Sequence, residues 1–446
     1  MSENTAALLQ PERGLQEGAP TQTSTMRSRE ASDSSIKVND LPIAASPPLA
    51  LTHDAPTCGL STNFSLTLHG DLHDIETEWK RFEQHADCAA FQHHIWLAKF
   101  QQHVGSRRGT KPAIVCGRDA SGSLLIILPL AIEAHGPFRC LTWLGSELCD
   151  YNMPILAKEF AQAVPADRFA AIWSDTLLLL RNDPGFRFDW IDLQKMPDAV
   201  GDQKNPFTGL DVAAHPSGAY VATLGRSWEA FYAEKRSAST RKRERRQFKH
   251  LAEHGKVQFV DVEDRVDVER TVATLIRQKS QSFVRMGVDD LMARPGYQAF
   301  YRDVATDAQA RGVIHVSRLD VGTRAVATGL GLRFRGSYYL ILSSYEDGAL
   351  TRFGPGRAHL NELIRSTIDR GFRYFDFTVG DEPYKRDWSD IELKLYDYLA
   401  PATMRGRLIV ATMVAFRRTK RFIKQTPVLW RVFSKARSIL ASLRRR

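Results

Sequence analysis

The chain has 446 residues, of which 43% are apolar and 10% aromatic, and this suits two globular domains better than one. Its formal net charge of +10 would suggest a nucleic-acid or membrane partner. Residues 401–446, however, hold 13 Lys or Arg and no acid, and subtracting this +13 leaves about −3 for residues 1–400. The charge therefore belongs to a tail, and we expect no nucleic-acid partner.

Neither a disulfide framework nor a membrane-spanning segment is expected. The five cysteines are scattered and contain no CxxC pair, which also argues against a zinc site. No run of 18 or more apolar residues occurs, and residues 1–50 lack the order of a secretory signal. We therefore expect a cytoplasmic protein with free thiols and no metal.

The first 60 residues are rich in Ser, Thr, Pro, Ala and Glu and show no sustained apolar periodicity. Such a segment cannot bury enough apolar surface to offset the entropy of ordering, so we predict that it is disordered. Apolar residues at helical spacing then predict two helices, the second of which carries His93, His94 and His103. We interpret these histidines as surface or capping groups, because no metal partners lie at suitable spacing.

The next part of the chain contains a structural unit that is repeated. Residues 113–144 and 313–342 each predict three strands joined by tight turns that contain glycine. An amphipathic helix follows each meander, at residues 169–180 and 358–370. The halves therefore look like copies of one α/β unit.

A strand follows each of these helices, at residues 185–193 and 371–379. Meander, helix and strand in this order predict a mixed, largely antiparallel sheet flanked by helices in each half. We place the first domain at residues 61–215 and the second at residues 216–400, before the tail at residues 401–446.

A strongly basic segment opens the second domain. Residues 233–255 contain eight Lys or Arg, with Phe248 and Leu251 as their apolar stripe. We expect one largely exposed helix that ends at Gly255. A solvated face is the simplest interpretation, and binding of phosphate, an anionic substrate or nucleic acid is the alternative.

The halves differ most where the third strand of each meander passes to the helix. The second half has a turn there with two glycines and two arginines: Arg352, Gly354, Pro355, Gly356 and Arg357. Glycines let the backbone approach a ligand, and the first amides of a helix point outward at the positive end of its dipole. We therefore predict a pyrophosphate site at this turn, and one such site per chain.

The segment from Arg352 to Trp388 resembles the GNAT-type acyltransferases of bacterial cellulose and exopolysaccharide biosynthesis, the CelD/BcsL-like group. These are relatives of the Fem peptidoglycan aminoacyltransferases, and the likeness extends over about residues 64–400. It implies two tandem GNAT-like domains, acetyl-CoA or another acyl-CoA as co-substrate, and residues 354–356 as the pyrophosphate loop. The acceptor would be a small molecule or a glycan or envelope precursor.

Acyl transfer from a thioester needs a base for the attacking amine, a donor to the carbonyl oxygen and an acid for the thiolate. Glu382 is our first choice for the base and Asp376 the second. Tyr384 is a candidate acid, and Lys385 a residue that orients an anionic acceptor or binds phosphate. For Asp376 and Tyr384 the alternatives are bracing a loop and packing.

Asp150 and Tyr151 occupy the first half's counterpart of the phosphate turn. They either line the acceptor site or brace the two halves against each other. The first half would then be a degenerate copy that serves as scaffold.

Residues 401–446 combine apolar residues at spacings of 3 and 4 with many Lys and Arg, which predicts basic amphipathic helices broken at Pro427. Peripheral contact at the inner face of the membrane and packing on the second domain are both open interpretations of this tail.

Two other functions of the protein also stay open. One is a Fem-like transferase that uses aminoacyl-tRNA, with Arg241 to Lys249 as a binding arm, and the other is a non-catalytic binding protein.

Overall fold

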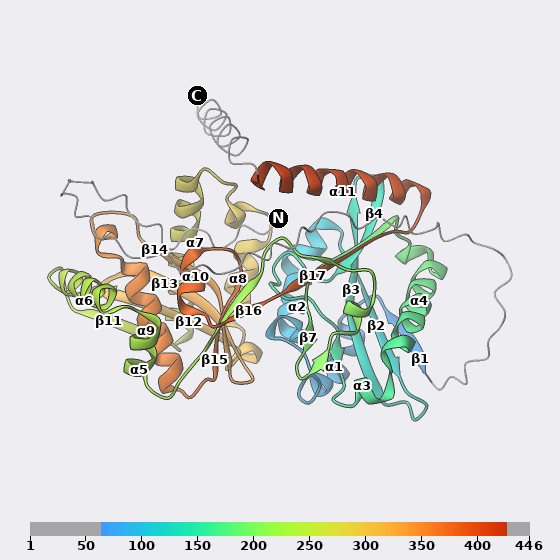
Figure 1. The fold of residues 1–446 in the computed structure, drawn as a ribbon, viewed down its shortest axis with the longest axis horizontal. Coiled ribbons are helices and arrows are strands. Elements are labelled where there is room, and N and C mark those ends of the chain that lie inside the picture. The colour runs from blue at the N-terminus through green and yellow to red at the C-terminus, as the bar shows by residue number, and fades with distance from the viewer. Residues whose placement is uncertain (1–63, 426–446) are drawn as a thin grey trace, which may run out of the picture. The chain divides into compact units, whose positions relative to one another are not determined.

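Each half of the chain contains one large sheet (Figure 1). The computed structural model describes residues 64–425. The first sheet contains, in spatial order, β1 (Ser65–His69), β2 (Lys111–Arg118), β3 (Leu124–His135), β4 (Phe138–Trp143), β6 (Trp190–Pro197), β17 (Leu395–Pro401) and β9 (Ala213–Ala214), with β5 (Ile155–Leu156) beside β3. The second contains β11 (Val257–Val262), β12 (Ile314–Val321), β13 (Arg324–Phe334), β14 (Ser337–Tyr345), β15 (Tyr374–Val379), β10 (Ala219–Thr223) and β16 (Ile391–Leu393).

Both predicted meanders are present, as β2 to β4 and as β12 to β14. In each half a helix follows the meander, α4 (Ala166–Asn182) or α9 (Pro355–Asp369), and returns the chain to a strand that pairs in parallel with the third meander strand. The strand after α4 begins at Trp190, later than predicted, because Pro184–Phe186 forms a 3-10 turn. The expected mixed, largely antiparallel α/β fold is confirmed.

One strand from the far end of the chain belongs to the first sheet. β17 runs antiparallel to β6, with Leu395 opposite Pro197 and Pro401 opposite Trp190. In the second sheet β10, which lies between the two meanders in sequence, pairs with both β15 and β16. The range predicted for the second domain, residues 216–400, therefore includes most of a strand that belongs to the first sheet.

Two long helices cover opposite faces of the second sheet. Gln278 on α7 (Arg265–Met286) accepts a hydrogen bond from the Thr328 hydroxyl of β13 at 2.7 Å. The next residue, Gly329, faces α9, because a Cβ atom there would lie 2.8 Å from the His359 ring. Neighbouring residues of a strand point to opposite faces, so α7 and α9 enclose the sheet between them.

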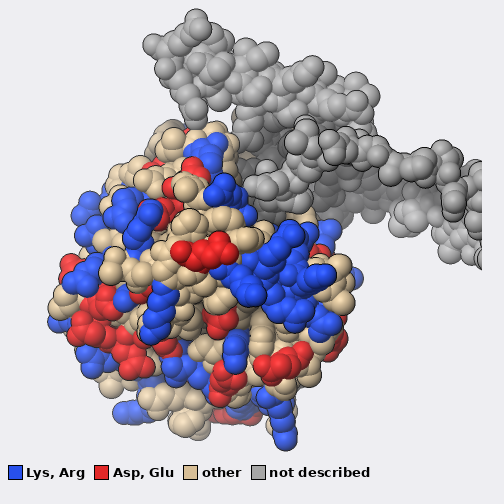
Figure 2. Space-filling view, turned by 90° about the vertical axis from the view of Figure 1, so that its left-hand side faces the viewer, with Lys and Arg blue, Asp and Glu red and all other residues tan. Residues whose placement is uncertain are grey.

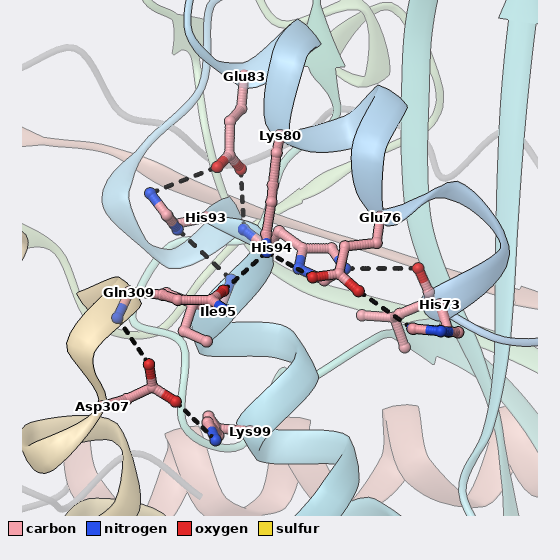
Figure 3. A network of polar contacts seen from close by, with 11 residues as sticks. His73, Glu76, Lys80, Glu83, His93, His94, Ile95, Lys99, Asp307 and Gln309 are labelled. Atoms are coloured by element: carbon pink, nitrogen blue, oxygen red, sulfur yellow. Dashed lines mark hydrogen bonds and ion pairs between the residues drawn. The ribbon is translucent and has the colours of Figure 1, made fainter.

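Polar side chains join the first helices of the chain to the second half (Figure 3). Lys80 Nζ donates to Gln309 at 2.8 Å, and Lys99 Nζ, on α2 (His94–Phe100), lies 2.8 Å from Asp307. Residues 64–425 belong to one compact unit. Contacts between the side chains of residues 80 and 309 and of residues 99 and 307 therefore join the two halves.

The histidines of this region are not all surface groups. His93 caps α2, and its Nε2 lies 3.3 Å from Glu83, whose carboxylate also accepts the N–H of His94 at 2.8 Å. Burial raises the pKa of Glu83 to about 7 and lowers that of His93 to about 4. The interpretation as a surface or capping group is wrong for His94, because its ring is buried edge-on against Trp79.

The last described helix, α11 (Met404–Gln425), is anchored to the first half at its start. The Asp189 carbonyl accepts the N–H groups of Ala402 and Thr403 at 2.7 and 3.0 Å, and a Cβ atom at Gly406 would overlap that oxygen. No helix of residues 64–425 is both long and apolar enough to span a bilayer. The disorder predicted for residues 1–60 and the break predicted at Pro427 both lie outside the described residues.

Candidate active site

Helix α9 begins at the predicted phosphate turn. Gly354 stands before the helix with φ +65°, which favours glycine, and Pro355 takes the first helical position, where its missing N–H leaves nothing unpaired. The amides of Gly356 and Arg357 follow in the first turn, where a helix offers them no acceptor. Together with the helix dipole, they form a place for an anion.

The two arginines of the turn point in different directions. Arg352 is exposed, and its guanidinium lies over the Phe353 ring at 4.8 Å. Arg357 is partly buried and donates to the Gln247 side chain at 2.8 Å, with the Glu244 carboxylate 3.8 Å from its Nε. Arg357 thus forms part of a wall, whereas Arg352 is free to reach an incoming phosphate.

A pocket of about 390 Å³ opens beside this turn. Two helices, α5 (Trp228–Lys235) and α6 (Ala238–Ala252), form the opposite wall. The pocket is lined by aromatic, basic and polar side chains: Trp228, Tyr232, Glu244, Arg245, Gln247, Phe248, Lys249, Phe353, Gly354, Arg357, Ala358, Asn361 and Glu362. Flat rings and cations next to free amides suit a nucleotide that carries phosphates.

The basic segment predicted as one helix to Gly255 forms two helices instead. Ser237 separates them, because its side chain accepts the N–H of Thr240 at 3.2 Å and so begins α6. The buried residues of α6 are Glu244 and Leu251, and the opposite side forms a basic surface visible in Figure 2. Its exposed cations are Lys242, Arg243, Arg245, Arg246 and Lys249. Since α6 lines the pocket, it is not a separate arm.

Strands β14 and β15 separate after a short parallel contact. Residues 337–339 pair with residues 374–376, and the remaining residues of the two strands do not pair with each other. Thr378, just beyond the contact, has φ +60°, which is rare for a β-branched residue and marks local strain. This divergence, the strand opening, is bridged by the Thr378 hydroxyl, which donates to the Leu340 carbonyl of β14 at 3.3 Å.

Asp376 and Tyr151, predicted in different halves, meet at the closed end of this opening. The Tyr151 hydroxyl donates to both carboxylate oxygens, at 2.8 and 3.0 Å, and the N–H of Thr378 donates to Oδ1 at 2.7 Å. Burial raises the pKa of Asp376 to about 7, and the charge of the partly exposed Asp150 acts in the same direction. Asp376 and Tyr151 therefore brace the two halves.

The other three predicted residues lie on or beside α10 (Pro383–Trp388), which follows β15. Lys385 is fully buried and donates to the Val379 carbonyl at 2.8 Å. Its Nζ also lies 3.1 Å from Glu382 Oε2, an ion pair without hydrogen-bond geometry. Tyr384 is buried edge-on against Phe377, and its hydroxyl has no hydrogen-bond partner among the described residues.

An aromatic stack connects the pocket with α10. Trp228 and Tyr232 of the pocket wall stack on each other at 4.7 Å, and Tyr232 lies 6.2 Å from Trp388 at a small interplanar angle. Phe231 stacks on the same Trp388 at 5.9 Å. The pocket, the turn at residues 352–357 and the Glu382–Lys385 pair thus belong to one continuous region.

Residues 238–386 match the family model described as an acetyltransferase (GNAT) domain. This range runs from α6 to α10 and contains the turn, the strand opening and the Glu382–Lys385 pair. The chain carries a GNAT acetyltransferase domain.

Solved structures resemble the chain over both halves. FemX superposes with a TM-score of 0.52 at 9% identity, covering 75% of this chain and 97% of that one, which shows a shared fold. The C-terminal domain of a putative lysylphosphatidylglycerol synthetase from Agrobacterium fabrum gives 0.46 at 9% (77% and 97%). A tandem GNAT protein from the clavulanic acid biosynthesis pathway gives 0.39 at 11% (76% and 99%). A search of curated protein sequences gave no match.

The phosphate turn of the GNAT domain, at residues 352–357, has no counterpart in the first half. Lys195, on β6, donates to the Ser146 carbonyl at 2.6 Å and to the Cys149 carbonyl, and so ties that connection to the sheet. Its φ of +60° matches that of Thr378 on the equivalent strand. One donor site per chain stays a prediction.

Lys279, a charged residue on α7 within the GNAT domain, was not among the predicted site residues. It is fully buried, and its Nζ lies 3.4 Å from the Ser343 carbonyl of β14. The signal was present, because Lys279 lies four residues from both Leu275 and Phe283 on the apolar stripe of the helix. A lysine at such a position indicates a buried charge.

Proposed function

We propose that the protein is an acyl-CoA-dependent acyltransferase that acylates an amine. The observation that carries this proposal is the α9 turn, whose free amides at Gly356 and Arg357 adjoin a pocket of about 390 Å³. The pyrophosphate would bind the amides and the nucleotide would enter the pocket. The arm of acyl-CoA that carries the thioester would extend between β14 and β15. The thioester would then lie near Glu382 and Lys385.

Residues 376–385 include candidates for the base and for the acid that the reaction needs. Glu382 is partly exposed and suits the role of base for the amine, whereas Asp376 is enclosed by Tyr151 and Thr378. Burial raises the pKa of the Tyr384 hydroxyl and so keeps it protonated, and no group in the described part of the chain accepts its proton; it would donate to the departing thiolate. These roles place the base and the acid on or next to one short helix.

The resemblance of residues 352–388 to the CelD/BcsL-like group supports a polysaccharide or cell-envelope precursor as the acceptor. That group acts in cellulose and exopolysaccharide biosynthesis.

Calorimetry with acetyl-CoA tests the donor. We expect saturable binding with one site per chain and a rise in the unfolding midpoint. Acetyl-pantetheine, which keeps the thioester and lacks the nucleotide and pyrophosphate, should bind at least tenfold more weakly. An absence of both heat and stabilisation with acetyl-CoA would contradict the proposal.

The exposed cations of α6 favour a second candidate, a Fem-like transferase that uses aminoacyl-tRNA. A distal arm would bind tRNA without competition from CoA, but α6 lines the pocket itself, so competition does not separate the two donors. Transfer of a radiolabelled aminoacyl group from charged tRNA does separate them. Such transfer, with no acetyl transfer, would establish the alternative.

Helix α11 supports peripheral membrane contact. Met404 and Leu408 are each 74% exposed, on the side away from Gly406, and Arg405 and Arg407 flank them. An apolar stripe between basic residues suits an anionic lipid surface. We expect the chain to float with phosphatidylglycerol vesicles.

The double change Met404→Gln and Leu408→Gln should reduce this recovery severalfold. Leu178→Gln, at a residue of α4 that is 57% exposed, is the matched control and should leave it unchanged. Equal recovery of all three chains, or none with wild type, would exclude this role of α11.

A further inference from the structure

Three charged side chains gather where β14 and β15 open, and two of them are fully buried lysines. Lys385 pairs with Glu382, and the charge of the same carboxylate acts to raise the pKa of Lys279. Burial lowers the pKa of Lys279 to about 8, and the Lys385 charge acts in the same direction. The cluster thus holds two cationic groups against one carboxylate.

Lys279 has little compensation for its burial. Lys385 donates to two carbonyl oxygens, those of Thr378 and Val379, at 3.5 and 2.8 Å. Among residues 64–425, Lys279 makes one hydrogen bond, a long one to the Ser343 carbonyl at 3.4 Å, and its Nζ lies 5.3 Å from the Phe283 ring. An ammonium has three donors, and a buried charge without partners is costly, so this site favours an added anion.

The two lysines come from different helices, α7 and α10, and contact carbonyls of different strands. Ser343, beside Lys279, is on β14, whereas Val379, beside Lys385, is on β15. The phosphates of an acyl-CoA have their own site at the α9 turn, so the anion needed here comes from another group. An anion held between the lysines would lie next to the thioester.

We propose that Lys279 and Lys385 bind a carboxylate of the acceptor, so that the substrate is an amine that also carries a carboxylate. This rests on the proposed acyl transfer and adds the class of acceptor. With this carboxylate bound, the cluster contains two cations and two anions, so its charges balance. It also holds the amine near Glu382.

Acceptors offered in matched pairs test this inference. Glycine and glycinamide, β-alanine and its amide, and 4-aminobenzoate and 4-aminobenzamide would be supplied with acetyl-CoA, and release of the CoA thiol measured. We expect kcat/KM to be at least tenfold higher for the carboxylate of a reacting pair. Lys279→Met should remove that preference, mainly through KM, and leave the amide unchanged, whereas Lys279→Arg should retain part of it.

Lys256→Met, at an exposed lysine outside the cluster, is the control and should behave as wild type. Equal use of both members of each pair would overturn the inference. So would an equal loss for both members in Lys279→Met, since it would indicate a role at the reacting carbonyl. Turnover of neither member, with acetyl-CoA bound, also counts against it.

A readout without turnover separates this inference from the donor proposal. The same carboxylates should raise the unfolding midpoint of wild type more than their amides do, and Lys279→Met should lose the difference while keeping a cooperative transition. A chain that fails to bind acetyl-CoA but shows this difference would contradict the donor and support the carboxylate site. The reverse result would contradict the carboxylate site alone.

Discussion

Gly356→Leu should weaken acetyl-CoA binding by at least 100-fold, about 2.7 kcal/mol or more. Gly356 is buried in the first turn of α9, where its amide faces the proposed pyrophosphate, and a branched side chain there would keep phosphate oxygens away from both first-turn amides. Leucine favours helix more than glycine does, so α9 itself should persist. Calorimetry and the unfolding midpoint measure the two effects separately.

Gly356→Ala and Gly225→Leu calibrate this result. Alanine adds one methyl group and should reduce affinity about tenfold or less. Gly225 lies in open space, so leucine there should leave binding unchanged. Wild-type affinity in Gly356→Leu would show that the α9 turn does not bind the donor.

Asp376→Asn should stabilise the protein relative to wild type as the pH rises from 4 to 7. Burial raises the pKa of Asp376 from an ordinary 3.8 to about 7, so between these values the unfolded chain releases a proton that the folded chain retains. Wild type therefore loses stability over this range, by up to about 4 kcal/mol from this residue, and the loss is complete above pH 7. Asparagine does not titrate and keeps an acceptor oxygen for Tyr151.

Urea unfolding at pH 4, 5.5, 7 and 8 measures the difference between the two chains. Other buried groups, such as Glu83, titrate in the same range, but they are common to both chains and cancel. Asp202→Asn, at an exposed aspartate, is the control, and its free energy of unfolding should differ from that of wild type by the same amount at each pH. A constant difference for Asp376→Asn would mean that the carboxyl is not held protonated by the interface.

Local patterns were sufficient for much of the fold and for the donor turn. Alternating apolar residues and glycine turns predicted both meanders, and the order of Gly354, Pro355 and Gly356 predicted the start of α9. These features depend on neighbouring residues, so the sequence contains them directly. The break at Ser237 is also local, but the density of charge on both sides concealed it.

Three further features that were not predicted depend on contacts between residues far apart in the sequence. The Tyr151–Asp376 pair joins residues 225 positions apart, and no local pattern connects them. The placement of β17 beside β6 is of the same kind. The role of α6 as a pocket wall follows from its contact with the turn at Arg357, which periodicity alone does not show.

The pairing of β17 with β6 has a consequence for synthesis on the ribosome. The strands from β1 to β6 emerge first, but β6 keeps an open edge until Leu395–Pro401 follows. An unpaired strand edge can pair with strands of other chains and so promote aggregation. A nascent multidomain protein carries this risk until the missing strand has been synthesised. The first half therefore acquires its final sheet only after the whole GNAT domain has been translated, and a chain truncated before residue 395 would retain an aggregation-prone edge.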